Sequence, residues 1–208
     1  MAVIAVAFFC TASYAQSRIK VACVGNSITA GSGVENRATQ SYPAVLQQLL
    51  GERYEVVNFG LGGRTLLYNG DRPYVNEKRF QESLEFNPDI VIIKLGTNDS
   101  KVKNWNDHGV EFEGDLRNFI DRYSALESSP EIYLCFPIWA ARGSFYIQES
   151  VIASEIIPII SRVAAEKGVK VIDLHTTLYG MPHLLPDGIH PNELGAMRIA
   201  NDVYDRIK

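Results

Sequence analysis

Five short apolar runs, separated by amphipathic stretches, constrain the fold of this chain more than any other feature. The clearest run is DIVIIKL at residues 89–95, which is rich in β-branched residues. Continuous apolar runs of this length are typical of parallel strands that are buried on both faces. We therefore predict five strands, over residues 19–24, 54–59, 89–95, 131–136 and 169–174.

Helical patterns occupy much of the sequence between these runs. The spacing of apolar residues predicts helices over residues 42–50, 112–126, 151–165 and 192–207. Pro158 interrupts the third of these helices, and Asn192 is placed to cap the last one. Strands that alternate with helices predict an α/β fold of right-handed βαβ units, with helices on both faces of a parallel sheet.

No internal repeat or linker divides the chain, and its 208 residues suit a single domain. We expect that domain over residues 16–208, as a three-layer α/β/α fold with the flavodoxin-like strand order 2-1-3-4-5. This order puts one strand between Cys23 and Cys135. Two strand spacings are about 9.6 Å, which exceeds the roughly 7 Å limit for a disulfide. Both cysteines should therefore be free thiols.

The first residues differ from the rest of the chain. Residues 2–10 are apolar and uncharged, and Ser13-Tyr14-Ala15 ends in a small residue, as signal peptides do. No Lys or Arg precedes the run, and a buried first strand is the alternative. Phe8 and Phe9 stand where small residues usually precede a lipidated cysteine, so Cys10 does not suggest a lipoprotein. We expect residues 1–15 to be a signal peptide and the mature protein to be periplasmic or extracellular.

The composition gives no electrostatic reason to bind nucleic acid or an anionic membrane, because the net charge is −4. We find neither a Cys/His cluster with metal-ligand spacing nor a cofactor fingerprint. The sequence therefore predicts no metal, no cofactor and no nucleic-acid partner. It does not predict an oligomeric state.

Polar residues and glycines follow four of the predicted strands. They form the blocks GNSIT at 25–29, NFGLGGRT at 58–65, GTND at 96–99 and, after a loop, DGIHP at 187–191. Ligands of open α/β sheets bind beyond the carboxyl ends of the strands. The four blocks should therefore meet at one edge of the sheet and form the functional site.

Ser27 is a candidate nucleophile in the first block. A serine at a strand-to-helix turn can also be a simple helix cap, and that alternative stays open at this point. The block is not the GxSxG elbow of α/β-hydrolases, because residue 29 is Thr, and it does not fit a phosphate-binding loop.

His190 is the candidate base for Ser27, because Asp187 precedes it by three residues. This spacing lets the carboxylate accept from Nδ1–H of the ring and leaves Nε2 free to face the serine. The spacing alone is common, and a surface pair is the alternative. His108, His175 and His183 have no acid at a comparable distance in a loop.

Asn98 and the glycine block supply candidate donors to an oxyanion. Acyl transfer develops negative charge on a carbonyl oxygen, which side-chain amides and backbone N–H groups stabilise. Gly62 and Gly63 would let the backbone approach a ligand closely, although a tight turn would also explain them. We expect Asp99 to hold its own loop by accepting backbone hydrogen bonds.

Together the four ordered blocks resemble those of the SGNH (GDSL-type) hydrolase superfamily, from Ile19 to the end of the chain. The resemblance implies a catalytic triad of Ser27, Asp187 and His190, with Gly63 and Asn98 in the oxyanion hole. Gly63 is chosen over Gly62 because it precedes the Arg-Thr pair, where relatives usually carry Gly-Asp-Thr.

Two residues depart from the family's pattern. Asn26 stands where the Asp of the GDSL motif usually lies, which predicts a change in local loop bonding. Arg64 stands in place of an Asp and changes the charge beside the oxyanion site. We assign Arg64 to substrate binding, because it could meet a substrate carboxylate.

The resemblance implies a serine esterase for short acyl esters, and acetyl is expected because no apolar lid is visible. Exported bacterial esterases that act on acetylated carbohydrates, including sialate O-acetylesterases, are similar. The expected partner is thus a small-molecule or glycan ester. An O-acetyltransferase and a non-catalytic carbohydrate-binding protein of the same fold are the alternatives. Aromatic residues in the loops could stack on sugars or plug the core: Tyr68, Tyr74, Trp105, Trp139 and Tyr146.

Overall fold

The computed structural model describes residues 17–208. The predicted signal peptide, over residues 1–15, lies outside the described residues. A single domain over residues 16–208 stays a prediction. Among the residues described, no helix combines the length and apolar character needed to cross a membrane.

Five parallel strands form one sheet in the order β2-β1-β3-β4-β5. This order confirms the predicted flavodoxin-like arrangement. The strands are β1 (Ile19–Gly25), β2 (Tyr54–Asn58), β3 (Ile90–Lys94), β4 (Glu131–Cys135) and β5 (Lys170–Ile172). Each predicted strand is present, and the observed strands are as a rule shorter than predicted.

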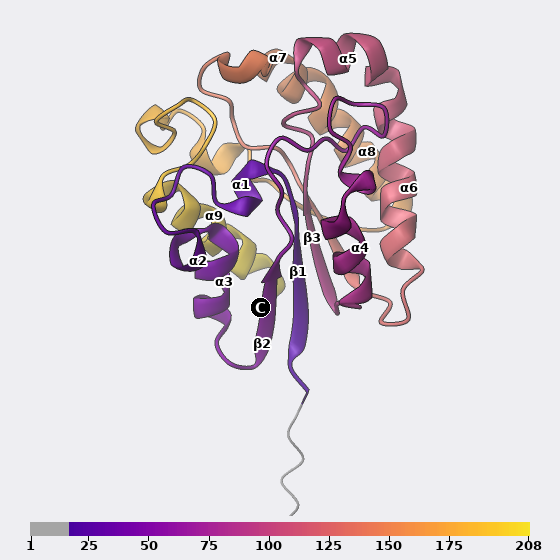
Figure 1. The fold of residues 1–208 in the computed structure, drawn as a ribbon, viewed down its shortest axis with the longest axis vertical. Helices are drawn as coiled ribbons and strands as arrows, with labels where there is room; N and C mark the ends of the chain where they lie inside the picture. Colours follow the sequence, from indigo (N-terminus) through magenta and orange to yellow (C-terminus); the bar gives the residue numbers. More distant parts are fainter. Residues whose placement is uncertain (1–16) are drawn as a thin grey trace, which may run out of the picture.

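Helices cover both faces of the sheet, so the predicted three-layer α/β/α architecture is confirmed (Figure 1). One face carries α3 (Tyr42–Leu50) and α9 (Glu193–Ile207), and the other carries α4 (Lys78–Glu85), α6 (Phe112–Ser124) and α8 (Ile157–Lys167). Shorter helices are α1 (Ser27–Ala30), α2 (Arg37–Gln40), α5 (Val102–His108) and α7 (Glu149–Val151). Asn192 caps α9 as predicted, since its side chain accepts from the backbone N–H of Gly195.

Side chains of each strand alternate between two apolar clusters. In β1, Ala22 and Val24 join the cluster under α4, α6 and α8, whereas Val21 and Cys23 join the cluster under α3 and α9. Both sets are fully buried. The strands are continuous apolar runs because both of their faces are covered.

The helix predicted over residues 151–165 is longer and has a local distortion. It begins at Glu149, passes through a π-helical segment at Ile152–Ile156 and ends at Lys167. Pro158 lies in the first turn after this segment. Because a proline has no N–H and clashes with the preceding turn, the wider π turn accommodates it without breaking the helix.

Cys23 and Cys135, the two cysteines among residues 17–208, are buried, and both are free as the strand order predicted. Burial raises the pKa of both thiols, that of Cys135 to about 12. Both are therefore inert thiols of the core.

Candidate active site

A pocket of about 210 Å³ lies at the carboxyl edge of the sheet, where the predicted blocks meet. Its lining comes from each of those blocks and from the loop after β4. It comprises Ser27, Ser32, Gly63, Thr97, Asn98, Lys101, Phe145, Ile147, Ile189 and His190.

Ser27 is the first residue of α1, and its neighbour Asn26 is the cap of that helix. Asn26 Oδ1 accepts from the backbone N–H of Ile28 at 3.1 Å. The hydroxyl of Ser27 is therefore not used as a cap, and it lies 2.8 Å from His190 Nε2. The helix-cap alternative for Ser27 does not fit this geometry.

His190 and Asp187 form the next link of the same chain of hydrogen bonds. His190 Nδ1 lies 2.6 Å from Asp187 Oδ2, while Asp187 Oδ1 accepts from the backbone N–H groups of Ile189 and His190. Burial raises the pKa of Asp187, but the hydrogen bonds from the backbone and ring of His190 outweigh that effect and leave it lowered. An ionised carboxylate holds Nδ1 as the donor, so Nε2 can accept the serine proton.

The glycine block runs beside the serine. A Cβ added to Gly62 would lie 3.9 Å from Ser27 Cβ, and Gly63 has a φ of +78°. This left-handed conformation is one that glycine adopts without strain. Gly63 lines the same pocket as Ser27.

Asn98 is buried and is fixed from two sides. Its Nδ2 donates to the carbonyl of Arg64 at 3.0 Å, and its backbone carbonyl accepts from Asn104 Nδ2 at 2.9 Å. An amide nitrogen carries two protons, so one remains for a ligand in the pocket. Asn98 and Gly63 both line the pocket of Ser27, so they are candidate donors to a ligand there.

Arg64 makes three hydrogen bonds within the chain. Its Nη1 donates to the carbonyl of Gly62 at 2.7 Å, and Nε and Nη2 both donate to Glu77 Oε1, at 3.0 and 2.8 Å. We predicted that Arg64 binds substrate, but Glu77 neutralises its charge and Gly62 uses a further donor. The arginine is better placed to hold the glycine block than to meet a substrate carboxylate.

Asp99 holds its loop as predicted, with Oδ1 accepting from the N–H of Leu67 and Oδ2 from that of Gly96. Of the other histidines, His175 pairs with Glu149 and His108 with Glu111. None of these two histidines and two glutamates lines the pocket of Ser27.

Sequence reasoning missed three residues around the site. Glu77 and Phe145 carry no motif that would have indicated them, whereas Lys94 was visible as a charge at the end of an apolar run. Among the aromatic residues named from sequence, Tyr74 is buried and donates to the carbonyl of Phe59, while Tyr146 is 80% exposed.

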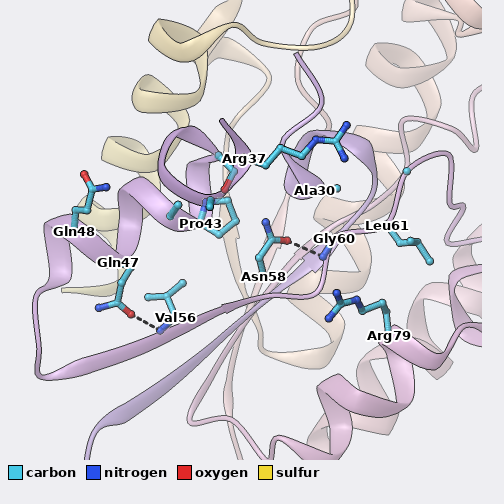
Figure 2. Close-up of a pocket in the computed structure, with 14 residues that line it drawn as sticks. Ala30, Arg37, Pro43, Gln47, Gln48, Val56, Asn58, Gly60, Leu61 and Arg79 are labelled. Carbon is cyan, nitrogen blue, oxygen red and sulfur yellow. Dashed lines mark hydrogen bonds between the residues drawn. The ribbon is translucent and has the colours of Figure 1, made fainter. Parts of the chain in front are cut away.

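A second hollow, of about 640 Å³, lies along the edge strand β2 and does not include Ser27, Asp187 or His190 (Figure 2). Figure 2 shows Gln47 against this strand, where Oε1 accepts from the N–H of Val56. Gln47 Nε2 also donates to the carbonyl of Tyr54. The side chain thereby occupies backbone groups that an edge strand would otherwise leave free for another strand.

Comparison with known proteins identifies the family of this chain. Residues 23–198 match the model of the GDSL-like lipase/acylhydrolase family. An acetylxylan esterase from Xylanibacter ruminicola (strain ATCC 19189 / DSM 19721 / CIP 105475 / JCM 8958 / 23) is 44% identical over 211 residues. That alignment includes 93% of this chain but only 44% of the relative, so the chain spans less than half of that protein.

Solved structures share the fold at low sequence identity. The acetyl xylan esterase AlAXEase superposes with a TM-score of 0.71 at 22% identity, covering 91% of this chain and 100% of its own. Est24, a carbohydrate acetylesterase from Sinorhizobium meliloti, gives 0.74 at 18% identity, covering 91% and 98%. With the family match over most of the described residues, these comparisons establish that the chain belongs to the GDSL-like lipase/acylhydrolase family.

Proposed function

We propose that this protein is a serine esterase that removes acetyl groups from carbohydrate, with acetylated xylan as the substrate class. The observation that carries the proposal is the continuous hydrogen-bond chain from Ser27 through His190 to Asp187, with links of 2.8 and 2.6 Å. Nucleophile, base and orienting acid within hydrogen-bond reach are the requirements of nucleophilic acyl transfer.

In the proposed mechanism, Ser27 Oγ attacks the ester carbonyl while His190 Nε2 takes its proton. The N–H groups of Ser27 and Gly63 and the amide of Asn98 stabilise the oxyanion. His190 then protonates the leaving alcohol, and the acyl group stays on Ser27. A water molecule, deprotonated by His190, attacks the acyl-enzyme and releases acetate.

The size of the pocket favours a short acyl group. At about 210 Å³ it is below the roughly 300 Å³ at which drug-sized ligand pockets begin. Each further CH₂ that became buried would contribute about 0.8 kcal/mol, so an enzyme for long chains needs a larger apolar site. We therefore expect acetyl esters to be preferred over butyryl and octanoyl esters.

The alcohol part of the substrate is inferred from the relative from Xylanibacter ruminicola, which is an acetylxylan esterase. The expectation of an acidic sugar, such as O-acetylated sialic acid, depended on Arg64 as the partner of its carboxylate. That arginine is paired with Glu77. The neutral polysaccharide is the better-supported substrate. Export of the protein remains our expectation, because xylan is a polymer that does not enter cells.

The test is acetate release from acetylated xylan, compared with release from acetyl, butyryl and octanoyl esters of p-nitrophenol. We expect acetate from xylan and a fall in kcat/KM with chain length, and Ser27→Ala should abolish both activities. A fluorophosphonate should label Ser27, which mass spectrometry would locate. No acetate release by the wild-type protein, or full activity of Ser27→Ala, would overturn the proposal.

The two alternatives give different outcomes in the same assays. A binding protein would retain xylan without releasing acetate. An O-acetyltransferase would transfer the acetyl group to added sugar acceptors faster than to water, which product analysis would detect.

A further inference from the structure

Two aromatic side chains stand exposed at the mouth of the candidate active site. Phe145 is 55% exposed and Tyr146 is 80% exposed. Both have a positive φ, of 58° and 62°. Bulky residues rarely adopt this strained conformation, and it persists only where the surrounding structure imposes it.

The loop that carries these residues is tied to both sides of the active site. Ser144 Oγ donates to the carbonyl of Asp187 at 2.7 Å. A few residues later, Gln148 Nε2 donates to the carbonyl of Ser100 at 2.9 Å, in the loop of Asn98. These anchors hold the aromatic pair in place relative to His190 and to the oxyanion donors.

Phe145 lies next to the candidate base. Its ring packs edge-on against the ring of His190, with 5.7 Å between the centroids. In acyl transfer the base that faces the serine also protonates the leaving oxygen. A group bonded to that leaving oxygen must therefore lie close to Phe145. The carbonyl oxygen, in contrast, would point to Gly63 and Asn98 in the proposed mechanism.

A cleft of about 590 Å³ continues from this point, away from Ser27. It shares Phe145 and Lys101 with the active-site pocket and is otherwise lined by Asp71, Val102, Lys103, Asn104 and Tyr146. Apolar surface dominates the lining, and Val102 is 44% exposed within it. Charged and amide groups also belong to its lining, and Lys101 is bound to Asp71 at 3.0 Å.

This combination suits a pyranose ring. The C–H face of a sugar packs on an aromatic ring, while its hydroxyl groups need donors and acceptors around the edge. The acyl chain of a long ester would also match this apolar surface. However, the acyl chain and the leaving oxygen are bonded to opposite sides of the reacting carbonyl carbon.

We propose that Phe145, Tyr146 and Val102 form a subsite that binds a sugar unit of the acetylated polysaccharide. The inference rests on the esterase function proposed above and adds a binding site for the alcohol part. Tyr146 is the residue to test, because it lines the cleft without contacting the proposed catalytic residues.

The experiment compares kcat/KM for acetylated xylan with kcat/KM for p-nitrophenyl acetate in each variant. Tyr146→Gly removes the ring at a position where glycine tolerates the positive φ, so the variant should fold. The ratio of the two values should fall about tenfold, mainly through KM for xylan, because one stacking contact is lost. Tyr146→Phe keeps the ring and should keep the ratio.

Tyr179→Ala is the matched control, because Tyr179 is an exposed tyrosine outside the cleft. Its ratio should equal that of the wild type. An unchanged ratio in Tyr146→Gly would overturn the subsite. A larger loss of kcat/KM on p-nitrophenyl octanoate than on xylan would also overturn it, because the cleft would then bind the acyl group. Failure of the esterase function itself would be distinct, since the wild-type protein would then release no acetate from either acetyl ester.

Discussion

Asn26 caps helix α1, and its neighbour Ser27 therefore keeps its hydroxyl free for the proposed chemistry. The side-chain oxygen of Asn26 accepts from the N–H of Ile28, while its buried Nδ2 has no hydrogen-bond partner among residues 17–208. A buried donor without a partner costs about 1–3 kcal/mol. An Asp, the usual residue of the family here, would have no such donor, so Asn26 changes the local bonding without touching the hydroxyl of Ser27.

At the same scale, Asn98→Ala tests the oxyanion site. Removing one such donor lowers kcat by roughly 10²–10³ in enzymes of this type, and we expect a loss in that range on acetyl esters. Because Asn98 also donates to Arg64, thermal unfolding of the variant should be measured alongside its steady-state kinetics. Asn69→Ala, at an exposed position outside the pocket, is the control. A kcat within a factor of about two of the wild type would exclude Asn98 as a donor.

The base is tested by comparing two histidines that each pair with a carboxylate. His190→Ala should reduce kcat more than Asn98→Ala does, because both proton transfers are lost. His175→Ala removes a residue that is bound to Glu149 and lies outside the pocket, so turnover should change little. Comparable losses in the two histidine variants would show that the base is wrongly assigned.

Among the elements, the glycine block after β2 depends on a residue at the start of α4. Glu77 is the residue before α4 and takes two hydrogen bonds from Arg64, whose Nη1 holds the carbonyl of Gly62. The carbonyl of Arg64 in turn accepts from Asn98. One arginine thus positions both proposed oxyanion elements, Gly63 through the chain and Asn98 through its amide.

Arg64→Ala and Glu77→Ala should therefore have similar effects. We expect each to lower kcat by roughly 10- to 100-fold on a neutral acetyl ester, because small displacements of catalytic groups are costly. The double variant should lose little more than either single one, since both changes break the same contact. If Arg64 instead bound the substrate directly, Arg64→Ala would raise KM while Glu77→Ala would not.

These elements also indicate how far the sequence could predict the structure. The strands and their order followed from apolar runs that the helices cover on both faces. Helix α4, with the sequence KRFQESLE, was not predicted because only Phe80 and Leu84 mark its buried face. Ser27, Asp187 and His190 were visible because each follows a strand at the sheet edge or has a telling spacing. Glu77 and Phe145 were not, because their partners are distant in sequence and only the folded chain brings them together.

Viewed as a whole, the molecule buries a lysine at the end of its central strand. Lys94 ends β3 with no exposed surface, and its Nζ lies 3.4 Å from Thr97 Oγ1. No carboxylate among residues 17–208 forms an ion pair with it. Burial lowers the pKa of Lys94 from its ordinary 10.5 to about 7, although the nearby thiol of Cys135 opposes the shift. An unpaired charge in such a site is costly, so the amine is neutral above that pH.

Lys94 should make the stability of the whole protein depend on pH. Above about pH 7 the folded state lacks a proton that the unfolded chain still binds, up to its pKa of 10.5. The free energy of unfolding should therefore rise with pH, by at most about 1.4 kcal/mol per pH unit. From about pH 9 the buried thiols reverse the trend, because they ionise only in the unfolded chain. Burial raises the pKa of the Asp99 carboxyl to about 7. Below pH 7 this group therefore makes the free energy of unfolding fall as the pH rises.

The interval from about pH 7.5 to about pH 8.5 isolates the lysine from these other groups. In Lys94→Met the free energy of unfolding, measured by urea denaturation, should be higher than in the wild type at the lower pH and nearly constant across the interval. Methionine fills a similar volume and needs no hydrogen bond, so the buried cluster should remain packed. Lys103→Met, on an exposed side chain of α5, should keep the wild-type slope. Equal slopes in Lys94→Met and the wild type would mean that the amine carries its proton inside the folded protein, and that the cluster around it is more polar than its residues indicate.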